Sequence, residues 1–405
     1  MPKRRVVITG LGVISPVGVG TEAFWQGMIA GKNGMSEVDV FDTSEFPCRR
    51  GGQVRGFDPY RYLSVESIER MGACAHFAVA AARMAVDDSR LNGNMEPERT
   101  AVAMGTTNGE CRIMETICSS WASDGYEQID PEVITKYPMH LISANVASEF
   151  GAEGPVVMMP NACSAGNWAI GFGADLIQAD EADVVLAGGC DALSRGAFVG
   201  FNRSFAMAPQ MCQPFDKNRK GLMAGEGAAV LVLESLEQAQ RRGAHIYAEV
   251  SGYGVSCDTY HITGPDPQGK GAVNATANAL KASGLTPEDI DYVCAHGTGT
   301  KPNDRVETLA MKKVFGDRAK RVPMSSIKSM IGHSFGAASA IEAAACALVI
   351  ETGMLPPTIN YHEPDPECDL DYVPNVAREH KVNALLSNAY AFGGNCAVLA
   401  LSAVR

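Results

Sequence analysis

Two kinds of segment alternate along this chain, and their alternation restricts the fold more than any other feature of the sequence. Short apolar runs rich in β-branched residues are typical of buried strands, and longer alanine-rich stretches are typical of helices. The first series runs through VVITGLGVIS, AHFAVAAARMAVDDS, TAVAMGT, ADVVLAGG and AAVLVLES. Strands and helices that alternate in this way predict a layered α/β fold.

A second series of the same kind begins near residue 247 and ends with a strand pair around LLSNAYAFGGNCAVLALS. The two series share a faint repeat, in which a strand, a glycine-bearing turn and a small-residue helix follow one another. The repeated segments are VVMMPNACSAGNWAIGFGADLIQA and VPMSSIKSMIGHSFGAASAIEAAACALVI. The loop-like stretches 34–60 and 354–382 do not resemble flexible linkers. We therefore expect two related halves, residues 1–246 and 247–405, packed as one unit.

Charge and hydropathy limit the partners and the compartment. The chain has 34 basic and 46 acidic residues, and its net charge of −12 disfavours nucleic-acid binding. No run approaches the ~20 apolar residues that a membrane span needs. Gly10, Gly12 and Pro16 interrupt the apolar N-terminal run, which is therefore interpreted as a strand and turn rather than a secretion signal. We expect a cytoplasmic protein with no nucleic-acid or membrane partner.

The cysteines and glycines give no sign of a metal or a redox cofactor. Twelve cysteines are scattered through a large chain, which favours reduced thiols. The close pairs Cys74 with His76 and Cys294 with His296 lack two further ligands at zinc-site spacing. The Gly10-Leu-Gly12 turn lacks the third glycine and the helix of a dinucleotide fingerprint. A small-molecule or acyl-carrier substrate is favoured.

Three residues that carry nucleophilic or acid–base chemistry lie where strands end. Cys163, in NACSAG, stands where a strand gives way to a small-residue helix, and a helix N-terminus lowers a thiol's pKa. His296 follows the strand DYVCA and is flanked by glycines, and His333 follows a second strand, with Lys328 five residues before it. Each alone is more often an inert buried cysteine or a core histidine. Together they lie at strand ends, where open α/β sheets bind ligands.

These segments resemble the β-ketoacyl-acyl-carrier-protein synthases of the elongating type, within the thiolase-like superfamily. The resemblance runs the whole length, from RRVVITGLGVISPVG through PFDKNRKGLMAGEGAAVLVLE, AHGTGTKPNDRVE and IKSMIGHSFGAASAIE to NAYAFGGNCAVL, in the family's order. It implies a thiolase-like five-layered αβαβα fold of two pseudo-repeated halves. It also implies a decarboxylative Claisen condensation of an acyl group with malonyl-acyl-carrier protein, in fatty-acid or type II polyketide elongation.

The resemblance also assigns roles to individual residues. Cys163 would hold the acyl group as a thioester, His296 and His333 would donate hydrogen bonds to the enolate of the decarboxylated malonyl group, and Lys328 would keep His333 oriented and neutral. The other matched residues are Thr298 and Thr300 for the pantetheine amides, Phe392 as a gate whose backbone N–H joins that of Cys163 in an oxyanion hole, Asn108 beside the acyl chain, and Asp304 and Glu307 as structural supports of the loops. The resemblance implies no tightly bound cofactor, because the substrates arrive on the phosphopantetheine of acyl-carrier protein.

Two alternatives remain. The G-H-S-F-G segment, Gly332–Gly336, fits the nucleophile elbow of a serine hydrolase with Ser334 as the nucleophile, although KSM intervenes between the strand and the elbow. The chain could also be a non-catalytic partner similar to a chain-length factor, but such partners lack the cysteine. The presence of Cys163, both histidines and Lys328 favours catalysis. The sequence leaves open whether the enzyme is a homodimer or pairs with a chain-length-factor-like subunit.

The sequence departs from the family pattern at three places. The segment SVESIERM carries Glu66 and Glu69 and leaves only Arg70 where fatty-acid enzymes have several basic residues for docking the carrier. Thr107 and Asn108 stand where aliphatic pocket residues are common, and an unpaired polar group beside a saturated chain is unfavourable. This favours a polar or unsaturated acyl chain and, with it, specialised polyketide elongation. Lys220 replaces a usual acidic residue, and the sequence alone gives no account of it.

Overall fold

The computed structural model describes residues 4–404 apart from residues 92 and 94. In the first half the main elements are β1 (Val6–Ser15), α1 (Thr21–Ile29), α3 (Ala73–Ser89), β5 (Thr100–Gly105), α4 (Cys111–Asp124), α5 (Pro131–Ile134), α6 (His140–Phe150), β6 (Val156–Met159), α7 (Ala165–Gln178), β7 (Val184–Asp191), α8 (Arg195–Arg203) and β8 (Gly227–Ser235). Helix α9 (Leu236–Arg241) ends the first half. In the second half the main elements are β9 (Ala248–Cys257), α10 (Lys270–Ser283), β10 (Tyr292–Cys294), α11 (Lys301–Phe315), β11 (Met324–Ser325), α12 (Lys328–Ile331), α13 (Gly336–Thr352), β14 (Ala384–Tyr390) and β15 (Asn395–Ser402). The shorter elements are β2 (Gly18–Val19), β3 (Ser36–Glu37), β4 (Arg50–Gly51), α2 (Val65–Arg70), β12 (Met354–Leu355) and β13 (Arg378–Glu379).

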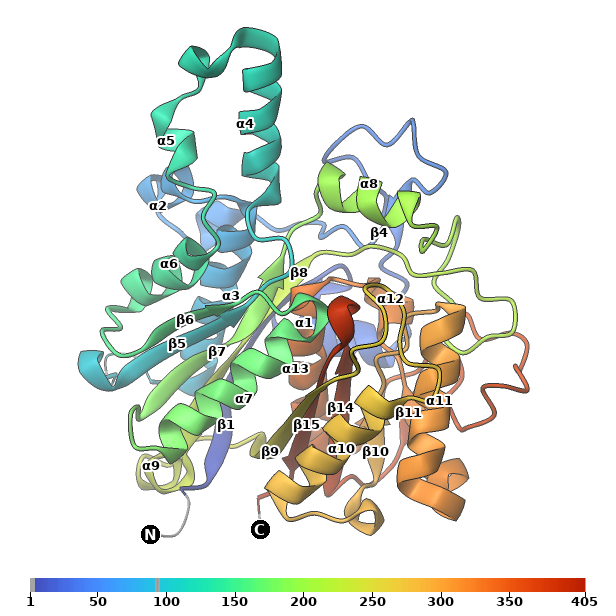
Figure 1. The fold of residues 1–405 in the computed structure, drawn as a ribbon. Helices are drawn as coiled ribbons and strands as arrows, with labels where there is room; N and C mark the ends of the chain where they lie inside the picture. Colours follow the sequence, from blue (N-terminus) through green and yellow to red (C-terminus); the bar gives the residue numbers. More distant parts are fainter. Residues whose placement is uncertain (1–3, 92, 94, 405) are drawn as a thin grey trace.

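The two halves have the same strand topology (Figure 1). The strands of the first half lie in the order β1-β8-β7-β5-β6 and those of the second in the order β9-β15-β14-β10-β11. Numbered along the chain within each half, both orders are 1-5-4-2-3. The pairing directions match as well, because in each half the first two pairs are antiparallel and the last two are parallel. The predicted internal repeat is therefore confirmed.

The two halves meet along a short seam. Strands β1 and β9 pair antiparallel only at Val7 with Glu249 and at Ile8 with Ala248. The sequence-based boundary at residues 246 and 247 falls in the connection between α9 and β9. Its position remains a prediction.

Helices form three layers around the strands. Helices α3 and α6 cover one face of the first half, α10 and α11 cover one face of the second half, and α7 and α13 lie between the halves and contact strands of both. Each helix layer packs on its own apolar cluster. The central cluster joins α7 and α13 to strands of both halves. The arrangement is the five-layered α/β fold that the sequence predicted.

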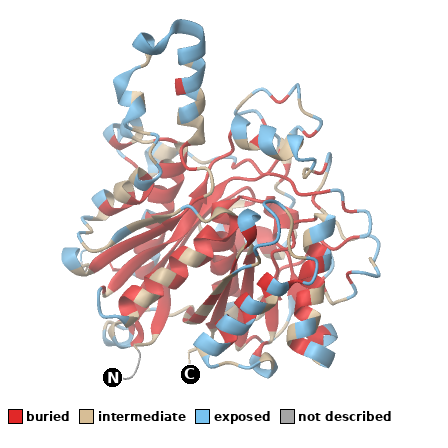
Figure 2. Cartoon of the chain, in the orientation of Figure 1, coloured by how far each residue is buried: buried red, intermediate tan, exposed pale blue. Residues whose placement is uncertain are grey.

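The central helices approach one another closely because small residues face each other. A Cβ added to Gly166 of α7 would lie 2.5 Å from the backbone nitrogen of Ala340 in α13. All residues of α13 from Gly336 to Val349 are buried, and the burial is visible as red ribbon in the centre of Figure 2. The alanine-rich composition that the sequence shows here is therefore a requirement of close helix packing.

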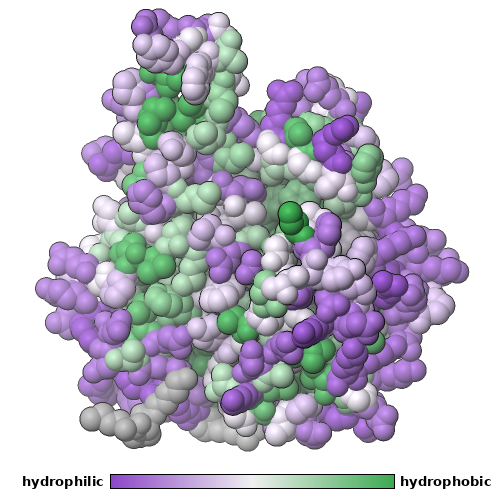
Figure 3. All heavy atoms as spheres, viewed as in Figure 1, coloured by the Kyte–Doolittle hydropathy of each residue, from purple (hydrophilic) through white to green (hydrophobic). Residues whose placement is uncertain are grey.

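An arm made of α4, α5 and their connection stands out from the body at the upper left of Figure 1. Hydrophobic residues on this arm reach the surface, as the green spheres in Figure 3 show. Trp121 is 62% exposed and Tyr126 is 68% exposed. The sequence reasoning did not single out this arm.

Two sequence-based expectations concern membrane-spanning helices and metal sites. Within residues 4–404, apart from 92 and 94, no helix is long and apolar enough to cross a membrane. In the same part of the chain, no group of three or more His, Cys, Asp or Glu side chains could hold a metal ion. The twelve cysteines are all free thiols.

Candidate active site

Cys163 lies in a 3₁₀ turn, Ala162–Ser164, that leads directly into α7. Its side chain is almost fully buried. Ala162 has a φ of 49°, a left-handed conformation that costs energy for any residue with a Cβ. This strained turn connects β6 to α7 and places Cys163 just before the first residue of that central helix.

His333 is fixed in a turn between α12 and α13. Its backbone N–H donates to the carbonyl of Met223 at 2.6 Å, and its carbonyl accepts from Gly225 at 2.8 Å. The N–H of Phe335 donates to the ring atom Nδ1 of His333 at 3.2 Å. Because Nδ1 is the acceptor in this bond, the ring proton of the neutral histidine lies on Nε2.

His296 follows β10 and is held by a carboxylate. The two oxygens of Glu307 accept hydrogen bonds from the backbone N–H groups of His296 and Gly297, both at 2.8 Å, and Asn388 donates to the same carboxylate at 3.1 Å. The ring centroid of His296 lies 5.4 Å from that of His333. Glu307 therefore has the structural role that the resemblance implied.

Both imidazoles are held neutral. Burial lowers the pKa of each histidine well below its usual value, and the positive charge of Lys328 lowers both further. Lys328 is buried and forms its ion pair with Glu342, not with His333. The predicted electrostatic effect of Lys328 is thus present, but Phe335, not Lys328, makes the orienting hydrogen bond to His333.

The expected pKa of Cys163 is wrong in direction. Burial raises the pKa of the thiol to about 11, while the charge of Lys328 and a hydrogen bond from the Phe392 backbone lower it to a smaller extent. Removal of the thiolate from water outweighs the lowering effect expected from the helix N-terminus.

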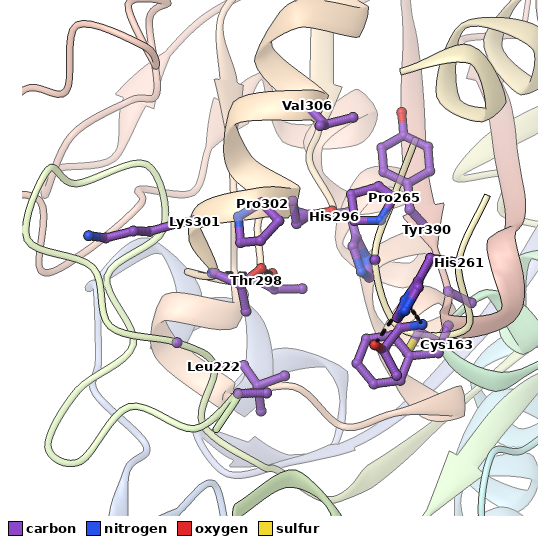
Figure 4. Close-up of a pocket in the computed structure, with 18 of the residues that line it drawn as sticks. Cys163, Leu222, His261, Pro265, His296, Thr298, Lys301, Pro302, Val306 and Tyr390 are labelled. Atoms are coloured by element: carbon purple, nitrogen blue, oxygen red, sulfur yellow. Dashed lines mark hydrogen bonds between the residues drawn. The ribbon is translucent and has the colours of Figure 1, made fainter. Parts of the chain in front are cut away.

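One cavity contains the cysteine and both histidines (Figure 4). Its volume is about 390 Å³. Cys163, His296, His333, Thr298 and Phe392 all line it, as do Thr300, Lys220, Lys301 and Tyr390. In Figure 4, Cys163 and Lys301 lie at opposite sides of the drawn residues, with Thr298 between them. The hydroxyls of Thr298 and Thr300 are 2.9 Å apart.

Phe392 stands at the surface of this cavity and is 38% exposed. The two glycines that follow have φ angles of 80° and 78°, so the loop uses conformations that other residues rarely adopt. The ring of Phe392 contacts Phe201 at a centroid distance of 5.7 Å. An aromatic residue on a glycine-rich loop is suited to a movable gate.

Asn108 is not among the residues that line this cavity. Its backbone N–H donates to Asp191 at 2.9 Å, and its side-chain nitrogen is buried without a hydrogen-bond partner, as is the hydroxyl of Thr107. The position of Asn108 beside an acyl chain remains a prediction. Ser334 is fully buried and also lies outside the cavity lining, which disfavours the hydrolase alternative.

The remaining singled-out residues have clear partners. Asp304 accepts from the N–H groups of Phe215 at 2.7 Å and Gly299 at 3.2 Å, in keeping with a structural role. Arg70 is exposed and pairs with Glu66 at 3.6 Å.

Sequence reasoning missed three buried polar residues that support the site: Asp191, Glu342 and Asn388. A charged residue inside an apolar strand or an alanine-rich helix is the signal that could have found the first two, because such residues are rarely buried unless paired.

Comparison with known proteins agrees with this geometry. Residues 3–239 match the model "Beta-ketoacyl synthase, N-terminal domain", and residues 247–362 match "Beta-ketoacyl synthase, C-terminal domain". The chain is 41% identical to 3-oxoacyl-[acyl-carrier-protein] synthase 2 of Synechocystis sp., over 99% of this chain and 98% of that protein. It is 43% identical to the tetracenomycin polyketide synthase ketoacyl synthase alpha subunit of Streptomyces glaucescens, over 98% and 97%.

Solved structures give the same result. The ishigamide ketosynthase/chain length factor matches with a TM-score of 0.96 and 43% identity, over 100% of both chains. The AntDE:AntF complex, a type II polyketide acyl-carrier protein with its ketosynthase, matches with a TM-score of 0.92 and 34% identity, also over 100% of both chains. The chain therefore belongs to the β-ketoacyl synthase family of condensing acyltransferases.

Proposed function

We propose that this enzyme condenses an acyl group on Cys163 with malonyl-acyl-carrier protein to give 3-oxoacyl-acyl-carrier protein and carbon dioxide. The observation that carries the proposal is the convergence of one thiol and two neutral imidazoles in a single cavity. A thiol serves thioester exchange, and neutral imidazoles serve as hydrogen-bond donors to a developing oxyanion.

In the first half-reaction, the Cys163 sulfur attacks the carbonyl of the incoming acyl thioester. A new carbon–sulfur bond forms to Cys163, the bond to the carrier sulfur breaks, and the thiol proton goes to the departing carrier thiolate. The backbone N–H groups of Phe392 and Cys163 are the donors proposed for the tetrahedral oxyanion. Hydrogen bonding by both backbones lowers the pKa of the thiol, which supports this assignment.

In the second half-reaction, the malonyl group loses carbon dioxide and its thioester oxygen becomes an enolate oxygen. His333 donates from Nε2, because Nδ1 already accepts from Phe335. His296 is the second donor. The enolate carbon then attacks the thioester on Cys163, forms the new carbon–carbon bond and releases the Cys163 thiolate, which takes up a proton from water.

The carrier arm is proposed to extend from Cys163 past Thr298 and Thr300 to Lys220 and Lys301. The threonine hydroxyls suit the pantetheine amides. Of the cations that line the cavity, Arg219 is buried against Asp304 and Asp365, whereas neither lysine has a salt bridge within the described residues. Lys301 also acts electrostatically on Asp365. The ammonium groups of Lys220 and Lys301 complement the phosphate of phosphopantetheine, and they give Lys220 a role at a position where the family has an acid.

The proposed partners are acyl-carrier protein and a second ketosynthase-type subunit, which is either another copy of this chain or a chain-length-factor-like protein. Two similar solved structures are the ishigamide ketosynthase/chain length factor and AntDE:AntF, a type II polyketide acyl-carrier protein in complex with its ketosynthase. The exposed apolar residues of the α4–α5 arm support pairing through this arm, since a projecting apolar surface marks an interaction site. Identities of 41% and 43% to fatty-acid and polyketide enzymes leave both pathways as candidates.

Intact-mass measurement after incubation with a panel of acyl carriers tests the proposal. Wild-type protein should gain the mass of one acyl group, and Cys163→Ala should gain none and form no condensation product. The matched control is Cys257→Ala, because Cys257 is an exposed thiol outside the cavity lining. Full acylation of Cys163→Ala at a residue competent for elongation would contradict the assignment. Including saturated and polyene carriers in the panel identifies the substrate class in the same experiment.

A further inference from the structure

The last residue of β7, Asp191, is a fully buried carboxylate that connects the two halves of the fold. Its Oδ1 accepts from the Thr106 hydroxyl at 3.0 Å and the Asn108 N–H at 2.9 Å. Its Oδ2 accepts from the Thr107 N–H at 2.8 Å and the Gly336 N–H at 2.7 Å. Three donors therefore come from the loop after β5, and the fourth comes from the first residue of α13.

The bond to Gly336 anchors the turn that carries His333. Phe335, between them, has a φ of 52°, which is strained for a phenylalanine and needs a fixed neighbour to persist. Gly336 is pressed against the loop after β5, since an added Cβ would lie 2.5 Å from the carbonyl carbon of Thr106. The conformation of Phe335 directs its N–H to Nδ1 of His333. A continuous path of hydrogen bonds and one strained residue thus leads from Asp191 to the imidazole.

We propose that Asp191 is a positioning residue that keeps the proton of His333 on Nε2 by holding Gly336 and, through it, the conformation of Phe335. The proposal rests on the proposed function, in which His333 donates its Nε2–H to the enolate oxygen. Without the anchor, Phe335 relaxes, Nδ1 loses its donor, and the imidazole is free to carry its proton on either nitrogen. Asp191 touches no substrate in this scheme and acts only through the turn.

The geometry requires a carboxylate at this position. Each carboxylate oxygen of Asp191 accepts two hydrogen bonds from N–H or O–H donors. An asparagine has one oxygen, so whichever way its amide is oriented, an NH₂ group faces at least one backbone N–H. Asp191→Asn therefore disrupts the anchor with little change in side-chain size.

A matched control lies at the other end of the same strand pair. Glu234 of β8 is also a fully buried carboxylate, and it accepts from Arg242 at 2.9 Å. It stands opposite Val184, the first residue of β7, whereas Asp191 is the last. Glu234→Gln removes a buried, hydrogen-bonded carboxylate, here paired with Arg242, without contact with the His333 turn.

Two measurements on the full-length enzyme test the proposal. The first compares malonyl-carrier decarboxylation with acyl transfer to Cys163. Asp191→Asn should lower the ratio of the two rates, by up to the about 10²–10³-fold that loss of one oxyanion donor costs, whereas Glu234→Gln should leave the ratio as in wild type. The second is ¹⁵N NMR of the histidine rings, in which His333 should show Nε2–H in wild type and lose this signature in Asp191→Asn. An unchanged ratio together with an unchanged tautomer would overturn the proposal.

A milder variant and the wild-type spectrum keep the proposal testable if Asp191→Asn does not fold. Thr106→Val removes one donor to Oδ1 and should lower the same ratio by a smaller factor. A wild-type His333 with its proton on Nδ1 would refute the inference without any variant. Because acyl transfer to Cys163 is measured separately, failure of the proposed function would appear as loss of acylation in wild type itself.

Discussion

Replacement of Lys328 by methionine gives the most quantitative test of the electrostatics of the site. Lys328 and Glu342 form an ion pair in which both side chains are almost fully buried. Removal of one partner of a buried pair costs about 3–5 kcal/mol, because the other charge is left without compensation. In this protein the cost depends on pH, since burial raises the pKa of Glu342 to about 7 even with Lys328 present.

The pH dependence follows from the direction of that shift. A carboxyl whose folded pKa is raised favours the folded state when protonated, so its contribution to stability falls as pH rises from the unfolded pKa to the folded pKa. Between pH 6 and pH 8 in wild type, the contribution of Glu342 to stability falls over about one pH unit, from pH 6 to its folded pKa of about 7. Without Lys328 its folded pKa rises further, so the fall in stability continues to higher pH. Each additional pH unit is worth about 1.4 kcal/mol.

Urea denaturation of Lys328→Met at pH 6 and pH 8 measures this difference at one fixed protein concentration, because self-association adds to apparent stability. The deficit relative to wild type should be larger at pH 8 by up to about 1.4 kcal/mol, and Lys328→Met with Glu342→Leu should recover most of it. The control is Lys217→Met, which breaks the exposed pair with Glu363 and should leave stability nearly unchanged at both pH values. Equal deficits for Lys328→Met at the two pH values would refute the reasoning.

Three further predictions concern substrate handling. His333→Ala should slow malonyl decarboxylation about 10²–10³-fold, the usual effect of losing one oxyanion donor, and should leave acyl transfer to Cys163 largely intact in single-turnover assays; equal losses would reverse the assignment. Asn108→Ile should shift the preference ratio toward saturated over polyene acyl carriers by about 10- to 100-fold relative to wild type in competition assays, since an unpaired amide beside a saturated chain costs about 1–3 kcal/mol. An unchanged ratio would place Asn108 away from the acyl chain. Lys220→Glu should raise KM for acyl carriers with little change in kcat. An unaltered KM would show that the phosphate of the carrier arm does not reach Lys220.

Residues at strand ends could be predicted from the sequence because their positions follow from topology alone. Cys163, His296 and His333 each follow a recognisable strand, and parallel strands of a repeated sheet bring such ends together. The family motifs then gave the roles proposed for Thr298, Thr300 and Phe392. The repeat itself was detectable because both central helices need small residues where they cross, as at Gly166.

Properties that depend on tertiary surroundings could not be predicted in the same way. The pKa of Cys163 depends on how completely the cavity excludes water, which one local motif does not specify. Asp191 has partners 83 to 145 residues away in the chain, so its hydrogen bonds have no local signature. The family resemblance assigned Lys328 to orient His333, whereas its ion-pair partner is Glu342, one helix further on.

The matching topology of the two halves also constrains how such a chain could have arisen. Helices α7 and α13 occupy corresponding places in the halves, and each is largely buried against the other. A half on its own would expose the apolar face of its central helix to water. Any half-length ancestor would therefore have needed a partner to cover that helix, as each half covers the helix of the other here.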